Sequence, residues 1–162
     1  MPKLISRQQA IEEIGKTLGK NECLVCNILS GDHAYVLEKS KYATVVLSEY
    51  PRNWGQTMIL LNAHKVSVSE ITKEEWAELT EKCREYSIRI EKVLKPVRCY
   101  ISSLGAAENL PNTCPHIHFN LIPVYDNSKP SEVFTWEKGV YSGTEKEWVE
   151  LFELLKPPSL RT

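Results

Sequence analysis

Apolar and polar residues recur along this chain with two different periods, and each period predicts a different kind of element. In the segment 72–94 the apolar side chains recur every three or four residues, as on one face of an α-helix. They are Trp76, Leu79, Cys83, Tyr86, Ile90 and Val93. Thr72 and Glu75 form a capping-box pattern at the start of this segment. The pattern therefore predicts a long amphipathic helix over 72–94.

Two shorter helices are expected near the ends of the chain. Ser6 and Gln9 form a capping pattern at the start of 6–19, and Thr144 opens a similar pattern at the start of 145–155. Other short runs are rich in β-branched and aromatic residues and predict strands. These strands cover 35–38, 42–48, 56–62, 98–104 and 116–123.

This order of elements predicts an α+β fold, with an antiparallel sheet of about five strands, one long helix and terminal helices. The chain is expected to be a single domain over 1–162, with a core at about 21–125 and a C-terminal extension at 126–162. Residues 21–32 are expected to form a short knuckle. The two ends of the chain would cover the site, extend a dimer or pack as core.

The composition of the chain limits which kinds of binding partner are expected. Of 162 residues, 42% are hydrophobic and 25% charged, with a net charge of −1, so a nucleic-acid polymer is not expected as the partner. No apolar run approaches the roughly 20 residues of a membrane span, and the polar N-terminus is unlike a signal peptide. A cytoplasmic location is therefore expected. The five cysteines are then expected to be thiols or metal ligands rather than disulfides.

Cys23 and Cys26 form a C-x-x-C motif, which supplies two of the four ligands of a zinc site. His64 and His116, at a strand end and a strand start, are candidates for the other two. Free thiols beside unrelated histidines are an equally good interpretation of the spacing. His33 is the next candidate ligand, and Cys114 is a rival ligand or a redox-sensitive neighbour. Cys83 and Cys99 are expected in the core.

The segment CPHIHFNLIPVY (114–125) places His116, His118 and Asn120 on one face of a strand. A neutral imidazole at His118 is a candidate nucleophile toward phosphorus, because it forms and then releases a covalent phosphoramidate. Its other ring nitrogen would need a hydrogen-bond acceptor. Gln56, Asn120 and Thr113 are candidate donors to the phosphoryl charge. A strand with satisfied polar groups is the alternative.

Three motifs together resemble the histidine-triad superfamily of nucleotidyl hydrolases and transferases. CLVCNILSGD is similar to the opening C-x-x-C motif of that family, GQTMILLNAHK resembles its G-H-x-L strand, and HIHFNLIP resembles its triad. The resemblance spans about Cys23 to Val124. It implies that His118 is the nucleophile and that Cys23, Cys26, His64 and His116 hold a structural zinc ion.

Two positions depart from the hydrolase pattern. Asn120 stands where the third histidine of the triad is expected, and Gln56 stands where the strand-start histidine is expected. Transferase branches carry H-x-H-x-Q, which Asn120 resembles. Asn112 and Thr113 would stand for the phosphate-contacting Gln-Ser pair of the hydrolases.

The sequence thus predicts a nucleotidyl hydrolase or transferase that acts at the α-phosphorus of a nucleotide or dinucleoside polyphosphate. Asn112, Ser48 and Trp54 are the expected substrate-binding residues, and a homodimer through residues 72–104 is expected. One alternative is a zinc-stabilised nucleotide-binding module with little turnover. Another is a hydrolase with catalytic zinc, held by His64, His116 and His118.

Overall fold

A five-stranded antiparallel sheet forms the centre of the protein, in a computed structural model that describes residues 2–17, 23–31, 33–110 and 113–160. The strand order is β2-β3-β4-β6-β5. The strands are β2 (Val36–Lys39), β3 (Ala43–Leu47), β4 (Thr57–Leu61), β5 (Arg98–Ser102) and β6 (His118–Val124). The predicted fold class is confirmed.

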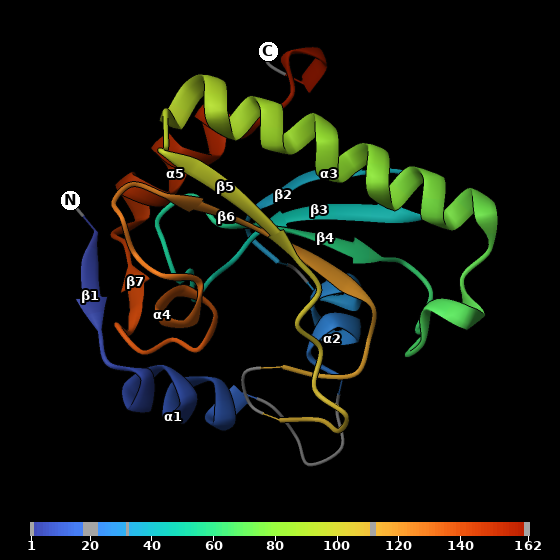
Figure 1. Ribbon diagram of the computed structural model, residues 1–162, viewed down its shortest axis with the longest axis horizontal. Coiled ribbons are helices and arrows are strands. Elements are labelled where there is room, and N and C mark those ends of the chain that lie inside the picture. Colours follow the sequence, from blue (N-terminus) through green and yellow to red (C-terminus); the bar gives the residue numbers. More distant parts are fainter. Residues whose placement is uncertain (1, 18–22, 32, 111–112, 161–162) are drawn as a thin grey trace.

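Helices cover both faces of this sheet (Figure 1). On one face lie α3 (Lys73–Leu94) and α5 (Glu145–Leu155), and their apolar side chains form the main core with alternate residues of the strands. On the other face, α2 (Leu24–Ser30) packs against Val46, Met58 and Leu60. Every residue of β3 and β4 is buried, because these central strands are covered on both sides.

The capping patterns of the sequence form as predicted. The Thr72 hydroxyl accepts from the Glu75 N–H at the start of α3, and the Glu75 carboxylate accepts from the Thr72 N–H. The same reciprocal bonds join Ser6 and Gln9 at the start of α1 (Arg7–Thr17). The predicted end of that helix at residue 19 lies outside the described residues.

The ends of the chain meet beside the sheet in a way that the sequence patterns did not predict. Strand β1 (Lys3–Ile5) pairs antiparallel with β7 (Val140–Ser142), and α4 (Pro130–Phe134) precedes β7. Gly139, with φ of 93°, makes the turn into β7 where the backbone of Ile5 passes closely, so a larger residue would clash there. Two 3-10 turns, Val68–Glu70 and Pro158–Leu160, complete the chain.

Three sequence predictions need correction. The segment 21–32, predicted as a short knuckle, contains the helix α2, which begins after its N-cap Cys23. Strand β6 begins at His118 and not at 116. Trp76 is 40% exposed, although it was predicted on the apolar face of the helix, while its neighbour Glu75 is buried beside Lys65.

Within the described part of the chain, no helix is both long and apolar enough to cross a membrane.

Candidate nucleotide site and metal centre

Strand β6 presents His118 and Asn120 on the face of the sheet that α2 covers. Asn120 is paired with Met58 of β4, and His118 is paired with Leu60. The alternate residue Leu121 points into the core beneath α3. The period-two pattern of the sequence therefore correctly separates the polar face of this strand from its core face.

The imidazole of His118 is buried and held in one tautomer. Its Nδ1–H donates to the carbonyl oxygen of His116 at 2.7 Å. Burial lowers the pKa of His118 below its ordinary value; the backbone bond to His116 opposes this shift, and the charge of Arg52 adds to it. The neutral ring therefore leaves Nε2 unprotonated, the form that a nitrogen nucleophile needs.

Two amides lie beside this histidine and are hydrogen-bonded to each other. Gln56 Nε2 donates to Asn120 Oδ1 at 2.9 Å, and Gln56 Oε1 accepts from the backbone N–H of Arg52 at 2.8 Å. Both side chains are buried. The bonds fix the amide planes and leave the Asn120 Nδ2 group without a partner among the described residues.

A cavity opens on this polar face, and His118, Asn120 and Gln56 all line it. Residues from α1, α2, the loop before β4 and the segment after α4 complete its wall. The lining includes Ile14, Val25, Ile28, His33, Ser48, Arg52, Thr113, Cys114 and Trp136. Apolar walls with a few converging polar groups are typical of small-ligand sites.

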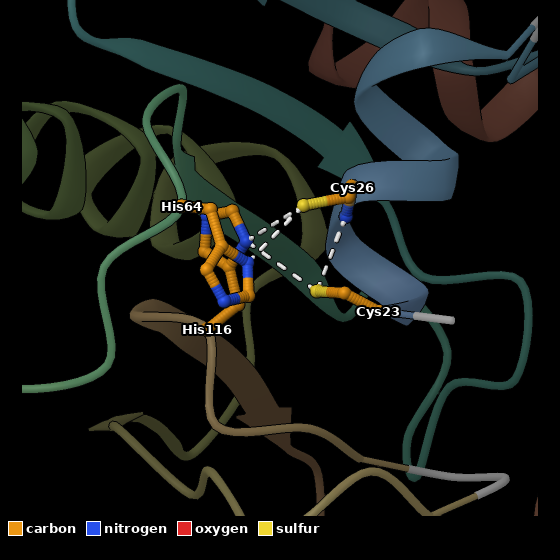
Figure 2. Close-up of side chains that lie close together, drawn as sticks. All are labelled: Cys23, Cys26, His64 and His116. Atoms are coloured by element: carbon orange, nitrogen blue, oxygen red, sulfur yellow. Dashed lines mark hydrogen bonds between the residues drawn. The ribbon is translucent and has the colours of Figure 1, made fainter. Parts of the chain in front are cut away.

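Next to the cavity, four side chains from three segments converge on one point (Figure 2). Cys23 and Cys26 come from the start of α2, His64 follows β4, and His116 precedes β6. Their four ligand atoms all lie within 4.8 Å of one another. Cys26 Sγ lies 3.2 Å from His64 Nδ1 and 3.4 Å from His116 Nδ1, and Cys23 Sγ lies 3.5 Å from His116 Nδ1.

These distances suit a tetrahedral metal ion. Zinc bonds of about 2.3 Å to sulfur and 2.0–2.1 Å to nitrogen, at the tetrahedral angle, place the S and N atoms about 3.6 Å apart. The Nε2–H of His116 donates to the carbonyl oxygen of Leu61 at 2.7 Å, so that Nδ1 carries the free lone pair. The sequence singled out the same four residues.

The remaining cysteines and histidines lie outside this group. Cys114 Sγ lies 3.4 Å from Cys23 Sγ, as a buried neighbour. His33 lines the cavity, with its Nε2 against the Leu47 carbonyl and its Nδ1 3.1 Å from Glu49. His118 is also outside the four, and its Nδ1 is already hydrogen-bonded to the His116 carbonyl. This geometry disfavours His33 as a ligand and His118 as part of a catalytic zinc site.

Of the three expected substrate-binding residues, one lines the cavity, one lies elsewhere and one is outside the described residues. Ser48 lines the cavity. Trp54 packs against Trp148 of α5, with ring centroids 4.4 Å apart, so it stabilises the helix layer and is not part of the lining. Asn112 lies outside the described residues. The hydroxyl of Thr113 lines the cavity while it donates to the Leu104 carbonyl at 3.0 Å.

Sequence reasoning missed Arg52, Trp136 and Ile14 as cavity residues. Arg52 belongs to the loop PRNWG, which directly precedes Gln56, and this proximity was the available signal. Ile14 and Trp136 come from the two ends of the chain, outside the motif-bearing region. The two ends of the chain lie together at the site, where β1 pairs with β7 and Ile14 and Trp136 belong to one buried apolar cluster.

The sequence matches no protein-family model and no curated protein. Solved structures are nevertheless similar to it. A hypothetical histidine triad nucleotide-binding protein from Sulfolobus tokodaii superposes with a TM-score of 0.64 at 20% identity, covering 82% of this chain and 89% of that one. A zinc-bound histidine triad family protein from Mycobacterium smegmatis gives 0.62 at 19% identity, over 85% and 93%.

A histidine triad protein from Bradyrhizobium japonicum gives a TM-score of 0.61 at 13% identity, over 74% of this chain and 86% of that one. All three likenesses extend over most of both chains. The order of strands and helices seen here is therefore that of the histidine-triad structures. The chain has the histidine-triad fold, with amides at two positions where the motif resemblance expected histidine.

Proposed function

We propose that this protein is a nucleotidyl hydrolase or transferase that acts at the α-phosphorus of a nucleoside phosphate ester, anhydride or phosphoramidate. The observation that carries the proposal is the fixed tautomer of His118. Its Nδ1–H is engaged with the His116 carbonyl, and the ring lines a cavity with an unprotonated Nε2. Such a nitrogen is prepared to attack phosphorus.

In the first step, the Nε2 lone pair forms the N–P bond while the bond from phosphorus to the leaving group breaks. The leaving group departs with that electron pair and takes its proton from solvent. Water or another acceptor then attacks phosphorus and gives up its proton to solvent, while the N–P bond breaks and returns its electron pair to Nε2. The positive ring formed between the two steps is stabilised by the Nδ1–H bond to His116.

The groups around His118 suit a phosphoryl group. Asn120 lines the same cavity, and its Nδ2 group would donate to a non-bridging oxygen. The Thr113 hydroxyl donates its proton to the Leu104 carbonyl, so it would bind a phosphate oxygen only after releasing that bond. Ser48 and the apolar residues of α2 would contact the ribose and the base. The hydrogen bond from Gln56 to Asn120 would orient the Asn120 side-chain amide in the free protein, before substrate binds.

The four-residue cluster would hold zinc as a structural ion, with two thiolates and two imidazoles. Burial raises the pKa of Cys23, so the free thiolate is unfavourable there until a cation compensates its charge. His116 is bound to Leu61 and offers its carbonyl to His118. The cluster would therefore fix the position of the nucleophile without meeting substrate.

The proposal is tested by product formation. The purified protein is incubated with adenosine and uridine phosphoramidates and dinucleoside polyphosphates, and nucleoside monophosphate is measured by chromatography. We expect release by the wild type and loss of at least about 10³-fold in His118→Ala, because the nucleophile is removed. Equal rates in the two proteins would contradict the assignment of His118.

A nucleotide-binding module without turnover is the second candidate. The mutual bonding of Gln56 and Asn120 favours it, because both amides already spend part of their hydrogen-bonding capacity within the protein. Nucleotide binding without release from any substrate of the panel would support this candidate against the enzyme.

A further inference from the structure

Arg52 lines the cavity with hydrogen-bond donors that the described residues of the protein do not use. The side chain lines the same cavity as His118. Its Nε donates to the carbonyl oxygen of Phe134 at 3.3 Å, and the guanidinium carbon lies 5.5 Å from the ring centroid of Trp136. These contacts fix the plane of the guanidinium and leave its two Nη groups without a hydrogen-bond partner among the described residues.

The charge of this guanidinium is not compensated within the described part of the protein. No carboxylate there lies within ion-pair distance of it, and the one acidic side chain of the cavity wall, Glu49, contacts His33 at 3.1 Å. Burial lowers the pKa of Arg52 to about 10, so the group is still charged at neutral pH. A partly buried cation without an anion is costly, and an anionic ligand would remove this cost.

A second unpartnered donor lies beside it. Trp136 is 5% exposed and lines the cavity, and its indole Nε1–H is buried without an acceptor among the described residues. Buried polar groups in proteins are nearly always satisfied. The guanidinium and the indole together form a donor-rich and acceptor-poor wall.

We propose that Arg52 is the phosphate-binding residue of this cavity, with Trp136 as the platform that holds it. Its Nη groups bind the non-bridging oxygens of the phosphoryl group that faces His118. The inference rests on the proposed function, because it assigns the same cavity to a nucleotide. It also gives a reason why amides suffice at Gln56 and Asn120: the arginine supplies the positive charge that histidines at those positions would share.

Arginine suits this role because its planar donors match two phosphate oxygens at once. Lysine would retain the charge but lose the paired geometry. The backbone N–H of Arg52 also donates to Gln56, so the loop that carries the arginine is joined to the amide pair. Phosphate binding at Arg52 and amide orientation at Asn120 are therefore parts of one hydrogen-bonded unit.

The test compares nucleoside monophosphates, which carry the phosphate charge, with the matching nucleosides, which do not. Binding of AMP, adenosine, UMP, uridine and inorganic phosphate to the zinc-loaded full chain is measured by calorimetry. The proteins are wild type, Arg52→Gln, Arg52→Lys and Arg84→Gln. Arg84 is exposed on α3 and pairs with Glu81, so its variant makes the same change of charge far from the cavity.

We expect the wild type to bind at least one monophosphate about tenfold or more tightly than the matching nucleoside, the effect of charged hydrogen bonds. Arg52→Gln should lose this preference while it keeps its affinity for the nucleoside, which also shows that it is folded. Arg52→Lys should keep part of the preference, and Arg84→Gln should keep all of it.

A full preference for the monophosphate in Arg52→Gln would overturn the proposal, as would a wild type that binds neither monophosphate nor inorganic phosphate. The two proposals fail separately. Charge preference that depends on Arg52, without product release, would support the phosphate site and contradict the enzyme. Product release that depends on His118 but is unchanged in kcat and KM by Arg52→Gln would support the enzyme and contradict the phosphate site at Arg52.

Discussion

At the scale of single residues, the site depends on hydrogen bonds that give each side chain one defined state. His118 is held by the His116 carbonyl, and Asn120 is held by Gln56, which is itself held by the backbone of Arg52. The sequence singled out His118 and Asn120 because they alternate on one strand, and Gln56 because it stands at the start of a second local motif. It did not indicate that the two amides bind each other, since this contact joins positions 64 residues apart.

The Gln56–Asn120 pair is expected to be energetically coupled. Replacing either residue with alanine leaves a buried amide unsatisfied, which costs about 1–3 kcal/mol of the free energy of unfolding. The double variant should lose less than the sum of the two single variants, by about 1 kcal/mol. Urea denaturation of the four proteins measures this coupling, and strictly additive losses would show that the bond does not form.

At the scale of elements, α3 is joined to the turn between β2 and β3 through Glu78. One carboxylate oxygen accepts from the Ser40 hydroxyl at 2.6 Å and from the N–H groups of Tyr42 and Ala43 at 2.7 and 3.0 Å. Burial alone would raise the pKa of Glu78, but these bonds outweigh it and lower the pKa below the ordinary 4.5. The ionised form therefore stabilises the packing of α3 on the sheet.

We expect Glu78→Gln to lower the free energy of unfolding by about 1 kcal/mol at pH 7. Because the folded pKa is depressed, this stabilisation is complete above pH 4.5 and is lost as the pH falls through the folded pKa. The wild type and the variant should converge in urea denaturation at acid pH. Glu153→Gln, an exposed control on α5, should change little. A difference that persists undiminished at low pH would refute this origin.

The start of α2 and the segments around β4 and β6 meet at the cluster of Cys23, Cys26, His64 and His116, the proposed zinc site. We expect one zinc ion per chain in elemental analysis, and loss of that zinc with a lower melting temperature in Cys26→Ser, because the variant removes one of four ligands. Cys114→Ser is the matched control and should retain the ion. Retention of zinc by Cys26→Ser, or its loss from Cys114→Ser alone, would contradict the assignment of ligands.

Helix and strand signals predicted nearly the whole central layer, because capping boxes and apolar periods are properties of short segments. The helix α2 was missed because only seven residues form it and its cap is a cysteine. Strands β1 and β7 were missed because each has three residues and is stabilised by the other. Trp136 lies just before β7 and packs with residues of α1, a long-range contact that no local pattern indicates.

At the scale of the whole molecule, α3 and β5 present an apolar groove to solvent. Ile88 and Ile101 are each 51% exposed and line this groove with Phe119. Exposed apolar groups of this kind gather at subunit interfaces. The predicted homodimer through residues 72–104 would bury them.

Ile88→Glu combined with Ile101→Glu should therefore convert a dimer into a monomer, because four carboxylates would be buried at the interface. Light scattering after gel filtration measures the mass. Val149→Glu, which changes an equally exposed residue on α5, should leave the dimer intact. A monomeric wild type would contradict this prediction directly.

Detection of the proposed nucleotidyl-histidine intermediate is the most direct test of the proposed function. The wild type and His118→Ala are mixed with each nucleotide substrate, quenched under conditions that preserve phosphoramidates, and measured by intact mass spectrometry. We predict an added nucleotidyl mass on the wild type, localised to His118 by fragmentation and absent from the variant. Product release without any adduct, or an adduct on another residue, would contradict the assignment of His118 as the nucleophile.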